Sequence, residues 1–334
     1  MPSKPEISVV LPVWNAECTI KCAVQSILSQ TLRNFELLVI DDGSTDRTPE
    51  ILDQVQDKRV QVVRTEHQGV AGAANLGNRL AKAAIIARMD ADDTADPQRL
   101  ACQLAHLQQH GLDVVGSRVQ IQPKNGRLTK GMARYEQWIN KETISSEMIL
   151  ALRFVEFPLV NPSIMARRSY YLQQFSDNSF PEDYDLMLRA ARSGMRFGKT
   201  PESLLQWNDS PNRLTRTDVR YSRQAFMDCR QYHLKNGPLL NISTVDLWGA
   251  GRTGKPWLRW LHSENIKVRN LIEVSTRKQG QLIHNVRVVP PESIGPPDGT
   301  PLVVCVGAAG ARPLITEFVT GQGYCVGEDV WFVA

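Results

Sequence analysis

The feature of this 334-residue chain that most constrains its fold is a regular alternation of apolar runs and amphipathic stretches in the first ninety residues. The apolar runs lie at 7–11, 35–40, 60–63 and 85–89, and the amphipathic stretches lie near 17–30, from 48 onward and at 70–83. Strand and helix patterns that alternate in this way predict a mainly parallel sheet flanked by helices. Thr48, which precedes Pro49, is expected to cap the second of these helices.

A second strand-helix-strand series begins at the apolar run 245–248, after an Asn-Gly-Pro sequence at 236–238 that is expected to end the preceding helix. The pattern between about 114 and 181 is less regular, and a strong helical pattern returns at 184–193. We therefore predict an α/β protein with two domains, at residues 1–237 and 243–334.

Composition and charge exclude several classes of protein. The residues are 42% hydrophobic and 22% charged, as in an ordinary globular protein, and a net charge of +4 is too small to indicate a nucleic-acid partner. We expect no secretion signal, because residues 1–6 lead directly into an apolar run, and the sequence has no apolar stretch of membrane-spanning length and no Cys-x-x-Cys pair. We expect a cytoplasmic protein with reduced thiols. A basic helical stretch at 216–235 leaves open a peripheral contact with the inner face of the membrane, although a solvated helix is the favoured interpretation.

Carboxylates follow two of the apolar runs, at the positions where parallel sheets bind ligands. Asp41 and Asp42 come after the second run, and Asp90, Asp92 and Asp93 come after the fourth. Three carboxylates so close together repel one another unless a cation lies among them. Oxygen ligands without nearby histidine or cysteine favour Mg²⁺ or Mn²⁺. A solvated acidic loop before a helix is the alternative interpretation.

Four segments of the chain together resemble the family 2 glycosyltransferases of GT-A fold. They are Ser-Val-Val-Leu-Pro-Val-Trp-Asn at 8–15, Phe-Glu-Leu-Leu-Val-Ile-Asp-Asp-Gly-Ser-Thr-Asp at 35–46, Met-Asp-Ala-Asp-Asp at 89–93 and Glu-Asp-Tyr-Asp-Leu at 182–186. The resemblance covers about two thirds of the chain and fades near Arg216. It implies a GT-A nucleotide-diphospho-sugar transferase fold, followed here by a small Rossmann-like α/β domain.

The resemblance also implies a donor site. The loop after the first strand would line the base pocket with Pro12, Trp14 and Asn15, and Asp41 would accept a hydrogen bond from a pyrimidine N–H. Packing in the core is the alternative for Trp14.

The paired aspartates of the Asp-x-Asp motif hold metal and ribose in the family. Carried over, Asp92 would bind Mn²⁺ or Mg²⁺, Asp90 would bind ribose, metal or both, and Asp93 would support them. The metal stabilises the nucleoside diphosphate that leaves.

The family's Glu-Asp motif implies that Asp183 is the catalytic base, supported by Glu182, in a single displacement that inverts the anomeric carbon. An acidic first helical turn is the alternative. Arg213 and Arg216 resemble a loop that closes over the donor and clamps its diphosphate, although solvated surface arginines would give the same pattern.

Three departures from the family pattern concern the phosphates, the acceptor side and processivity. Ala74 stands where relatives usually have Arg, and Asn161 replaces a frequent His. The Gln-x-x-Arg-Trp motif of processive synthases is absent, so transfer of single sugars is expected.

The second domain opens with Gly-x-Gly-x-x-Gly, formed by Gly249, Gly251 and Gly254, directly after its first strand, and Glu273 ends the next apolar run. This spacing is typical of dinucleotide folds. The 92 residues from 243 to 334 are expected to leave no room for a separate oxidoreductase site, so NAD binding is less favoured than binding of another nucleotide, an acceptor or a partner protein. The alternative is that the glycines serve only a tight turn and close helix packing.

We therefore expect an inverting, metal-dependent glycosyltransferase of the hexosyl- or N-acetylhexosaminyl-transferase class. Its donor would be a nucleoside-diphosphate sugar, with UDP-sugars favoured, and its acceptor a glycan, lipid-linked or protein hydroxyl in bacterial surface glycan or glycoconjugate synthesis. The alternatives are a nucleotidyltransferase and a non-catalytic subunit that binds nucleotide sugars.

Overall fold

The computed structural model describes residues 4–123, 126–142, 145–176, 179–209 and 213–334, which form two compact units. The first unit comprises Met1–Ile149 and Pro158–Cys229, and the second comprises Leu150–Phe157 and Arg230–Ala334. The second unit thus includes a short segment that the sequence pattern assigned to the N-terminal domain. The predicted limits of 237 and 243 stay a prediction.

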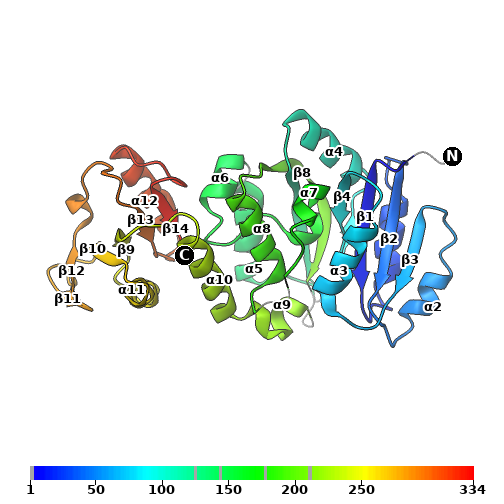
Figure 1. Ribbon diagram of the computed structural model, residues 1–334, viewed down its shortest axis with the longest axis horizontal. Coiled ribbons are helices and arrows are strands. Elements are labelled where there is room, and N and C mark those ends of the chain that lie inside the picture. Colours follow the sequence, from blue (N-terminus) through cyan, green and yellow to red (C-terminus); the bar gives the residue numbers. More distant parts are fainter. Residues whose placement is uncertain (1–3, 124–125, 143–144, 177–178, 210–212) are drawn as a thin grey trace. The chain divides into compact units, whose positions relative to one another are not determined.

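The first unit is built on one sheet with the order β3-β2-β1-β4-β7-β6-β8-β5. Figure 1 shows the neighbouring strands β3, β2, β1 and β4 of this sheet. Its strands are β1 (Ile7–Val13), β2 (Phe35–Asp41), β3 (Val60–Arg64), β4 (Ile85–Arg88), β5 (Thr94–Ala95), β6 (Val114–Pro123), β7 (Met165–Arg167) and β8 (Phe197–Asp209). Strands β1 to β4 are mutually parallel, whereas β7 runs antiparallel to β4 and β6, and β5 runs antiparallel to β8. The predicted α/β architecture with a mainly parallel sheet is confirmed.

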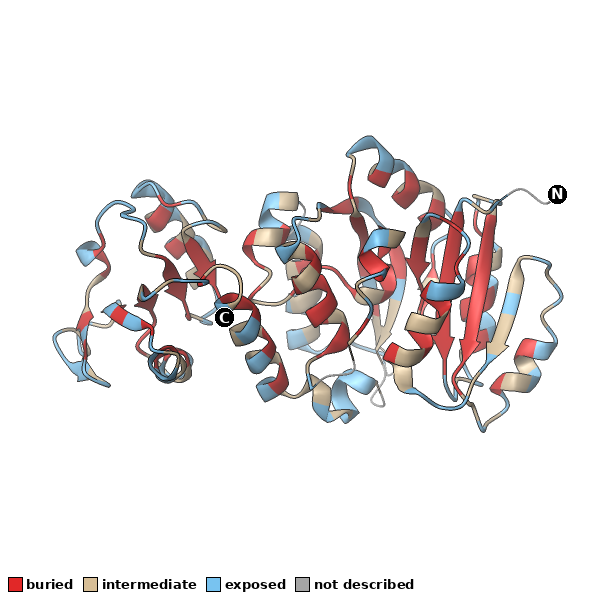
Figure 2. Cartoon of the chain, viewed as in Figure 1, coloured by how far each residue is buried: buried red, intermediate tan, exposed pale blue. Residues whose placement is uncertain are grey.

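Strands β1 and β2 are buried along their whole length, as Figure 2 shows. The helices of this unit are α1 (Ile20–Leu28), α2 (Thr48–Asp53), α3 (Gly69–Leu80), α4 (Arg99–Gln109), α5 (Lys130–Gln137), α6 (Ser146–Ala151), α7 (Arg168–Tyr171), α8 (Glu182–Arg192) and α9 (Leu214–Thr217), with α10 (Arg223–Lys235) at its end. The shorter helical turns are η1 (Trp138–Glu142), η2 (Asn161–Ser163) and η3 (Val219–Tyr221). The carboxyl ends of β1, β2 and β4 thus lead into the loops that carry the predicted donor site.

The prediction that Thr48 caps α2 is wrong. Thr48 is the first residue of the helix, and its hydroxyl oxygen accepts a hydrogen bond from the Ala16 N–H at 2.8 Å. The side chain therefore ties α2 to the loop after β1 instead of satisfying the N–H groups of its own helix.

The second unit contains the sheet β11-β12-β10-β9-β13-β14. Its elements are β9 (Thr244–Trp248), α11 (Gly254–Ser263), β10 (Lys267–Ile272), β11 (Leu282–Ile283), β12 (Val286–Val289), η4 (Pro291–Ser293), β13 (Leu302–Val304), α12 (Ala311–Gly321) and β14 (Val330–Phe332). All pairings are parallel except that of β11 with β12. The strand order reverses at β9, which is typical of doubly wound nucleotide-binding sheets.

Two of the motif glycines in this unit serve backbone packing. Gly249 has φ +125°, and a side chain on Gly254 would place its Cβ 1.7 Å from the Gly249 carbonyl oxygen. Glu273, the residue after β10, accepts a hydrogen bond from Lys278 Nζ at 2.8 Å. The glycines therefore permit the tight turn and the close start of α11.

Within the residues that the structure describes, every helix is too short or too polar to cross a membrane.

Candidate functional site

The acidic loop after β4 brings three carboxylates together. Each of Asp90, Asp92 and Asp93 offers an oxygen, and these oxygens lie within 4.8 Å of one another. Asp93 is 1% exposed, and one of its oxygens accepts the Asn208 N–H at 2.9 Å. Its other oxygen is buried and has no hydrogen-bond partner among the described residues. A buried carboxylate oxygen without a donor is a costly arrangement, and a divalent cation would satisfy it.

The pKa values of the two downstream acids reflect this crowding. Burial, and next the neighbouring Asp90, raises the pKa of the Asp92 carboxyl. Burial, followed by the charges of Asp92 and Asp90, raises the pKa of Asp93 well above its ordinary value. The cluster therefore resists holding three negative charges by itself, and the donor set fits Mg²⁺ or Mn²⁺.

Two side chains, for which the sequence reasoning predicted no such role, hold this loop in place. Arg88 is 3% exposed, and its Nε and Nη2 lie 2.9 Å and 2.8 Å from Asp90 Oδ1. Asn208 on β8 donates from its backbone N–H to Asp93 and from Nδ2 to the Asp92 carbonyl oxygen at 2.6 Å. A charged residue inside the short buried strand β4 was the available signal for Arg88. Asn208 gave no such signal, because its partner Asp93 lies 115 residues away.

The two predicted clamp arginines differ in their surroundings. The Arg213 guanidinium lies over the Trp207 ring, 4.1 Å from its centroid, and its charge counteracts the rise in the pKa values of Asp92 and Asp93. Arg216 instead forms an ion pair with Asp209 at 2.7 Å. Of these two arginines, Arg213 is therefore the one whose charge acts on the acidic loop.

The predicted base lies at the start of α8. Burial, followed by the charge of Glu182, raises the pKa of Asp183 to about 7, and the charge of Asp90 adds to the effect. Glu182 is 3% exposed and accepts a hydrogen bond from the Tyr221 hydroxyl at 2.7 Å. The negative charges of Glu182 and Asp90 therefore both act on Asp183. Its pKa of about 7 is suited to proton transfer near neutral pH.

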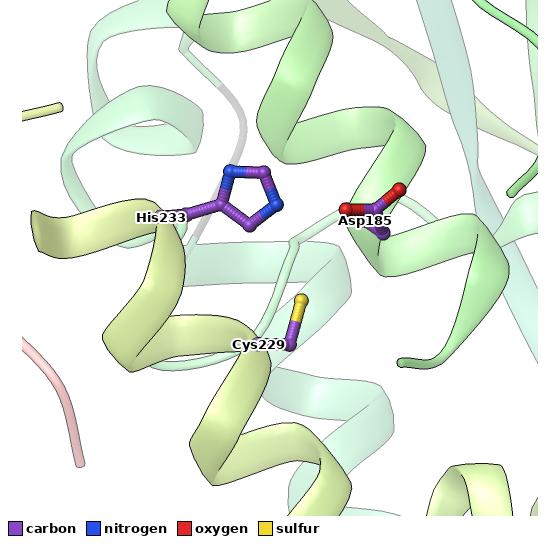
Figure 3. Close-up of side chains that lie close together, drawn as sticks. All are labelled: Asp185, Cys229 and His233. Atoms are coloured by element: carbon purple, nitrogen blue, oxygen red, sulfur yellow. The ribbon is translucent and has the colours of Figure 1, made fainter. Parts of the chain in front are cut away.

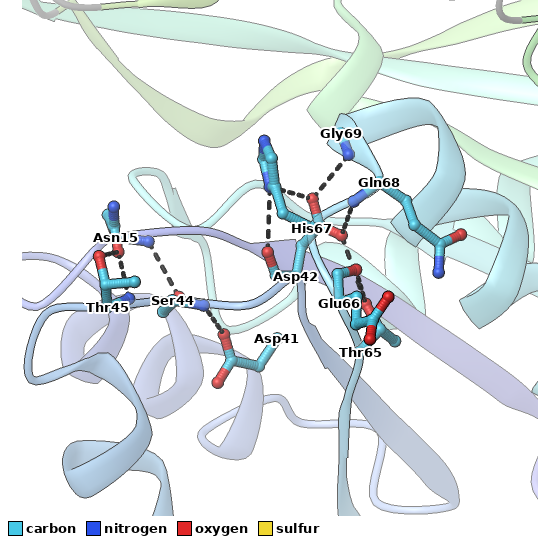
Figure 4. A network of polar contacts seen from close by, with 10 residues as sticks. All are labelled: Asn15, Asp41, Asp42, Ser44, Thr45, Thr65, Glu66, His67, Gln68 and Gly69. Atoms are coloured by element: carbon cyan, nitrogen blue, oxygen red, sulfur yellow. Dashed lines mark hydrogen bonds and ion pairs between the residues drawn. The ribbon is translucent and has the colours of Figure 1, made fainter.

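The loops after β1 and β2 form a connected polar network, drawn in Figure 4. The Asn15 side-chain oxygen accepts the Thr45 N–H at 2.8 Å, and Asp41 Oδ1 accepts the Ser44 N–H at 3.0 Å. Pro12 lies within β1, paired with Ile40 of β2. The amide oxygen of Asn15, predicted to line the base pocket, therefore holds the loop after β2.

Asp42 connects this network to the start of α3. Its two carboxylate oxygens accept the backbone N–H groups of Gln68 and Gly69, each at 2.8 Å. The Nδ1 atom of His67 lies 2.9 Å from Asp42 Oδ2. The carboxylate thereby fixes the direction of the His67 ring.

An aromatic pair lies beside this network. Trp14 is 51% exposed, and its ring stacks on that of His67 with centroids 4.7 Å apart and an angle of 28° between the planes. Trp14 is therefore not a core residue. The stacked pair is about half exposed and adjoins Asp42 through His67, which is a further residue that the sequence reasoning missed.

Other polar features lie outside this set of residues. Figure 3 shows Asp185 on α8 and Cys229 and His233 on α10, all three buried. Asp185 accepts hydrogen bonds from Ser176 Oγ at 2.6 Å and Arg189 Nε at 2.9 Å, which indicates a structural role. A cleft of about 610 Å³ along α1, β5 and β8 is lined by none of the predicted site residues.

Comparisons with known proteins agree that this chain is similar to glycosyltransferases. A protein-family model described as "Glycosyl transferase family 2" matches residues 8–174. An uncharacterized glycosyltransferase of Haemophilus influenzae is 40% identical over 111 residues, which are 32% of this chain and 44% of the relative. The O-antigen biosynthesis glycosyltransferase WbnJ of Escherichia coli is 28% identical over 238 residues, which are 69% of this chain and 87% of that protein. The chain thus spans less than half of the first relative and most of the second.

Solved structures show a similar fold. S. aureus TarS in complex with UDP-GlcNAc has a TM-score of 0.55 and 20% identity over 70% of this chain and 67% of that one. The mannosyltransferase PcManGT from Pyrobaculum calidifontis, in complex with GDP-Man and Mn²⁺, has a TM-score of 0.51 and 21% identity over 79% of this chain and 70% of that one. At these identities the likeness concerns the fold.

Proposed function

The chain belongs to glycosyl transferase family 2, whose model matches half of its residues, and from this premise we propose that it moves a single sugar from a nucleoside-diphosphate sugar to an acceptor hydroxyl. The observation that carries the proposal is the acidic loop Asp90–Asp92–Asp93, which has a buried oxygen without a partner among the described residues. The charge of Asp90 in this loop also acts on the Asp183 carboxyl. A solvated acidic loop would not bury Asp93 so completely.

Asp92 and Asp90 would hold Mn²⁺ or Mg²⁺, and Asp93 would contribute its free oxygen. The ion would neutralise charge that develops on the diphosphate leaving group. Arg88 keeps one oxygen of Asp90 engaged, so that the other is left for the metal or the ribose. Arg213 would add a second positive charge on the diphosphate side, whereas the ion pair with Asp209 makes Arg216 the weaker clamp.

The nucleoside would bind at the ends of β1 and β2. Its base would stack on the exposed face of Trp14, and the Asp41 carboxylate would accept a pyrimidine N–H. We favour a UDP-sugar because the Asp41 carboxylate would accept the uracil N3–H, and TarS, which has a similar fold, binds UDP-GlcNAc. A guanine N–H would also suit this acceptor, and PcManGT binds GDP-Man, so the donor screen includes GDP-sugars.

Asp183 would act as the base. As the acceptor oxygen attacks the anomeric carbon, its proton passes to the Asp183 carboxylate while the bond between that carbon and the diphosphate oxygen breaks. One displacement inverts the anomeric centre and requires no protein nucleophile. A pKa of about 7 allows Asp183 to be ionised in part near neutral pH and to hold the proton afterwards.

We place the enzyme in bacterial surface glycan or glycoconjugate synthesis, with a hexosyl or N-acetylhexosaminyl donor and a glycan, lipid-linked or protein hydroxyl as acceptor. The name of the E. coli relative supports this setting. The alternatives are a nucleotidyltransferase and a non-catalytic nucleotide-sugar subunit. The second unit would supply an acceptor, nucleotide or partner contact, since its motif glycines already serve backbone packing.

Thermal-shift measurements test the donor site. UDP-, dTDP- and GDP-sugars are screened with and without Mn²⁺ against the wild type, Asp92→Ala and the control Asp228→Asn, an exposed acid on α10. We expect one donor to raise the melting temperature of wild type and control only with metal, because binding to the native state stabilises it. Stabilisation that persists in Asp92→Ala, or none with any donor, would contradict the proposal.

A further inference from the structure

The loop after β3 carries a histidine whose ring is held by a buried carboxylate (Figure 4). His67 Nδ1 lies 2.9 Å from Asp42 Oδ2 and 3.1 Å from the Asp42 carbonyl oxygen. Asp42 is 2% exposed, and its carboxylate also accepts the backbone N–H groups of Gln68 and Gly69, each at 2.8 Å. Because two backbone donors fix this carboxylate, it anchors the imidazole in one orientation.

The backbone of His67 is held by the loop after β2. Gly43 in that loop has φ +73°, and a Cβ on it would lie 3.0 Å from the His67 backbone nitrogen. The Thr65 N–H donates to the Asp41 carbonyl oxygen at 2.9 Å. The two loops therefore pack against each other, so that both the backbone and the ring of His67 are fixed.

Trp14, in contrast, is 51% exposed on the loop after β1. Its ring stacks on that of His67, with centroids 4.7 Å apart and an angle of 28° between the planes. An exposed tryptophan can rotate about two side-chain torsions, and stacking on a fixed ring restricts that rotation. Because β2 lies between β1 and β3 in the sheet, the stack also joins the loops on either side of the Asp41 position.

We propose that His67 is a positioning residue for the donor: by stacking on Trp14, it holds the indole in the orientation that binds the nucleobase. This inference rests on the proposed function, which assigns Trp14 to the base site. The contacts run from the buried Asp42 carboxylate through His67 to the exposed indole. The ring is thus ordered before the donor arrives, and a preorganised site binds more tightly because less freedom is lost on binding.

A surface pair that only stabilises the two loops is the alternative interpretation. That alternative predicts that loss of His67 lowers the melting temperature of the free protein without a selective effect on donor affinity. The positioning role predicts the reverse, since the stack orders one exposed ring and contributes little to the core.

Fluorine NMR of the full chain, labelled with 5-fluorotryptophan and free of nucleotide, tests the stack by itself. Trp14→Phe identifies the Trp14 resonance among those of the seven tryptophans. We expect His67→Ala to shift this resonance. The control is His110→Ala, because His110 is also an exposed histidine in contact with a neighbouring ring, and it should leave the resonance unchanged. An unchanged Trp14 resonance in His67→Ala overturns the inference.

Calorimetric titration with UDP, dTDP and GDP in excess Mn²⁺ tests the consequence for binding. We expect His67→Ala to weaken the affinity for the nucleotide that binds by about three- to tenfold, as for loss of one aromatic pair. His67→Phe keeps a stacking ring and should lose less affinity than His67→Ala, and His110→Ala should match the wild type. In donor turnover the loss should appear in the donor KM with kcat within about twofold, because the base is remote from the reacting carbon.

The outcomes separate this inference from the proposed function. Equal nucleotide affinity in wild type and His67→Ala overturns the positioning role while the glycosyl transfer stands. Tighter binding by His67→Ala also overturns it, since the ring would then occupy the place of the base. A lower melting temperature of nucleotide-free His67→Ala with unchanged affinity supports the alternative. If the wild type binds no nucleoside diphosphate, the donor site itself is refuted, and the role of His67 with it.

Discussion

Asp183 links the proposed reaction to pH. Its pKa in the folded protein is about 7 and its ordinary value is 3.8, because burial and then Glu182 disfavour the charged form. The free enzyme's kcat/KM is therefore expected to fall as the pH decreases through about 7, since the base must be ionised to accept the proton. Asp183→Asn should abolish transfer at every pH. A kcat/KM profile that is flat from pH 5 to 8 would argue against Asp183 as the base.

The same residue makes a prediction about stability. Because the folded-state pKa is raised, the folded protein still holds a proton on Asp183 at pH values where the unfolded chain has lost it. The stabilisation from this proton is therefore complete below about pH 4 and is lost as the pH rises through 7. The melting temperature of Asp183→Asn minus that of the wild type should therefore be larger at pH 8 than at pH 5. The exposed-acid control Asp228→Asn should show no such gain.

Arg88 is the positioning residue for Asp90. Arg88→Met removes both N–H donors from one carboxylate oxygen of Asp90 and should reduce Mn²⁺ affinity and kcat/KM by roughly 10- to 100-fold, as for other residues that orient metal ligands. Arg88→Lys should recover part of the loss by restoring the charge. Arg47→Met removes an exposed cation and serves as the control. Equal Mn²⁺ affinity in Arg88→Met and Arg47→Met would rule out the positioning role.

The site residues that follow strands or lie in family motifs could be predicted from the sequence. Residues whose role depends on contacts with distant parts of the chain could not. Asp90, Asp92 and Asp93 directly follow a buried strand, so their proximity could be predicted from the chain. Tyr221, by contrast, binds Glu182 across 39 residues. Such pairings depend on how the elements pack.

At the scale of elements, the clearest failure of pattern reading is β8. This 13-residue strand is buried at its start, exposed at Pro201–Ser203 and mixed thereafter, and its register with β6 shifts near Arg118. Neither a period of two nor a period of 3.6 describes it. Strands β1 and β2 were predictable because both faces are covered, which makes the whole run apolar.

The start of α11 gives a prediction at the same scale. Gly254→Ala would place its Cβ 1.7 Å from the Gly249 carbonyl oxygen, so the turn after β9 must shift, at a cost of about 1–3 kcal/mol. Gly295→Ala meets no atom within 4 Å and should be neutral. Chemical denaturation compares the two. Equal free energies of unfolding would show that the glycines do not serve packing.

At the scale of the whole molecule, the two sheets could be predicted in outline. The predicted GT-A fold is confirmed for the first unit, where the strand-helix alternation and the family motifs coincide. The assignment of residues 150–157 to the second unit could not be predicted, because these residues interrupt the first unit in sequence. Their contacts are long-range, as shown by Phe154, whose ring meets Trp331 edge-on at 5.9 Å.

The measurement that tests the central claim most directly is release of nucleoside diphosphate from the donor that the thermal-shift screen selects. It compares wild type, Asp92→Ala, Asp183→Asn and Asp228→Asn, each with Mn²⁺ and with chelator. We predict that wild type and Asp228→Asn turn over the donor only with Mn²⁺. Asp183→Asn should bind the donor without turnover, and Asp92→Ala should lose both binding and turnover. Undiminished turnover in Asp92→Ala or Asp183→Asn would contradict the account.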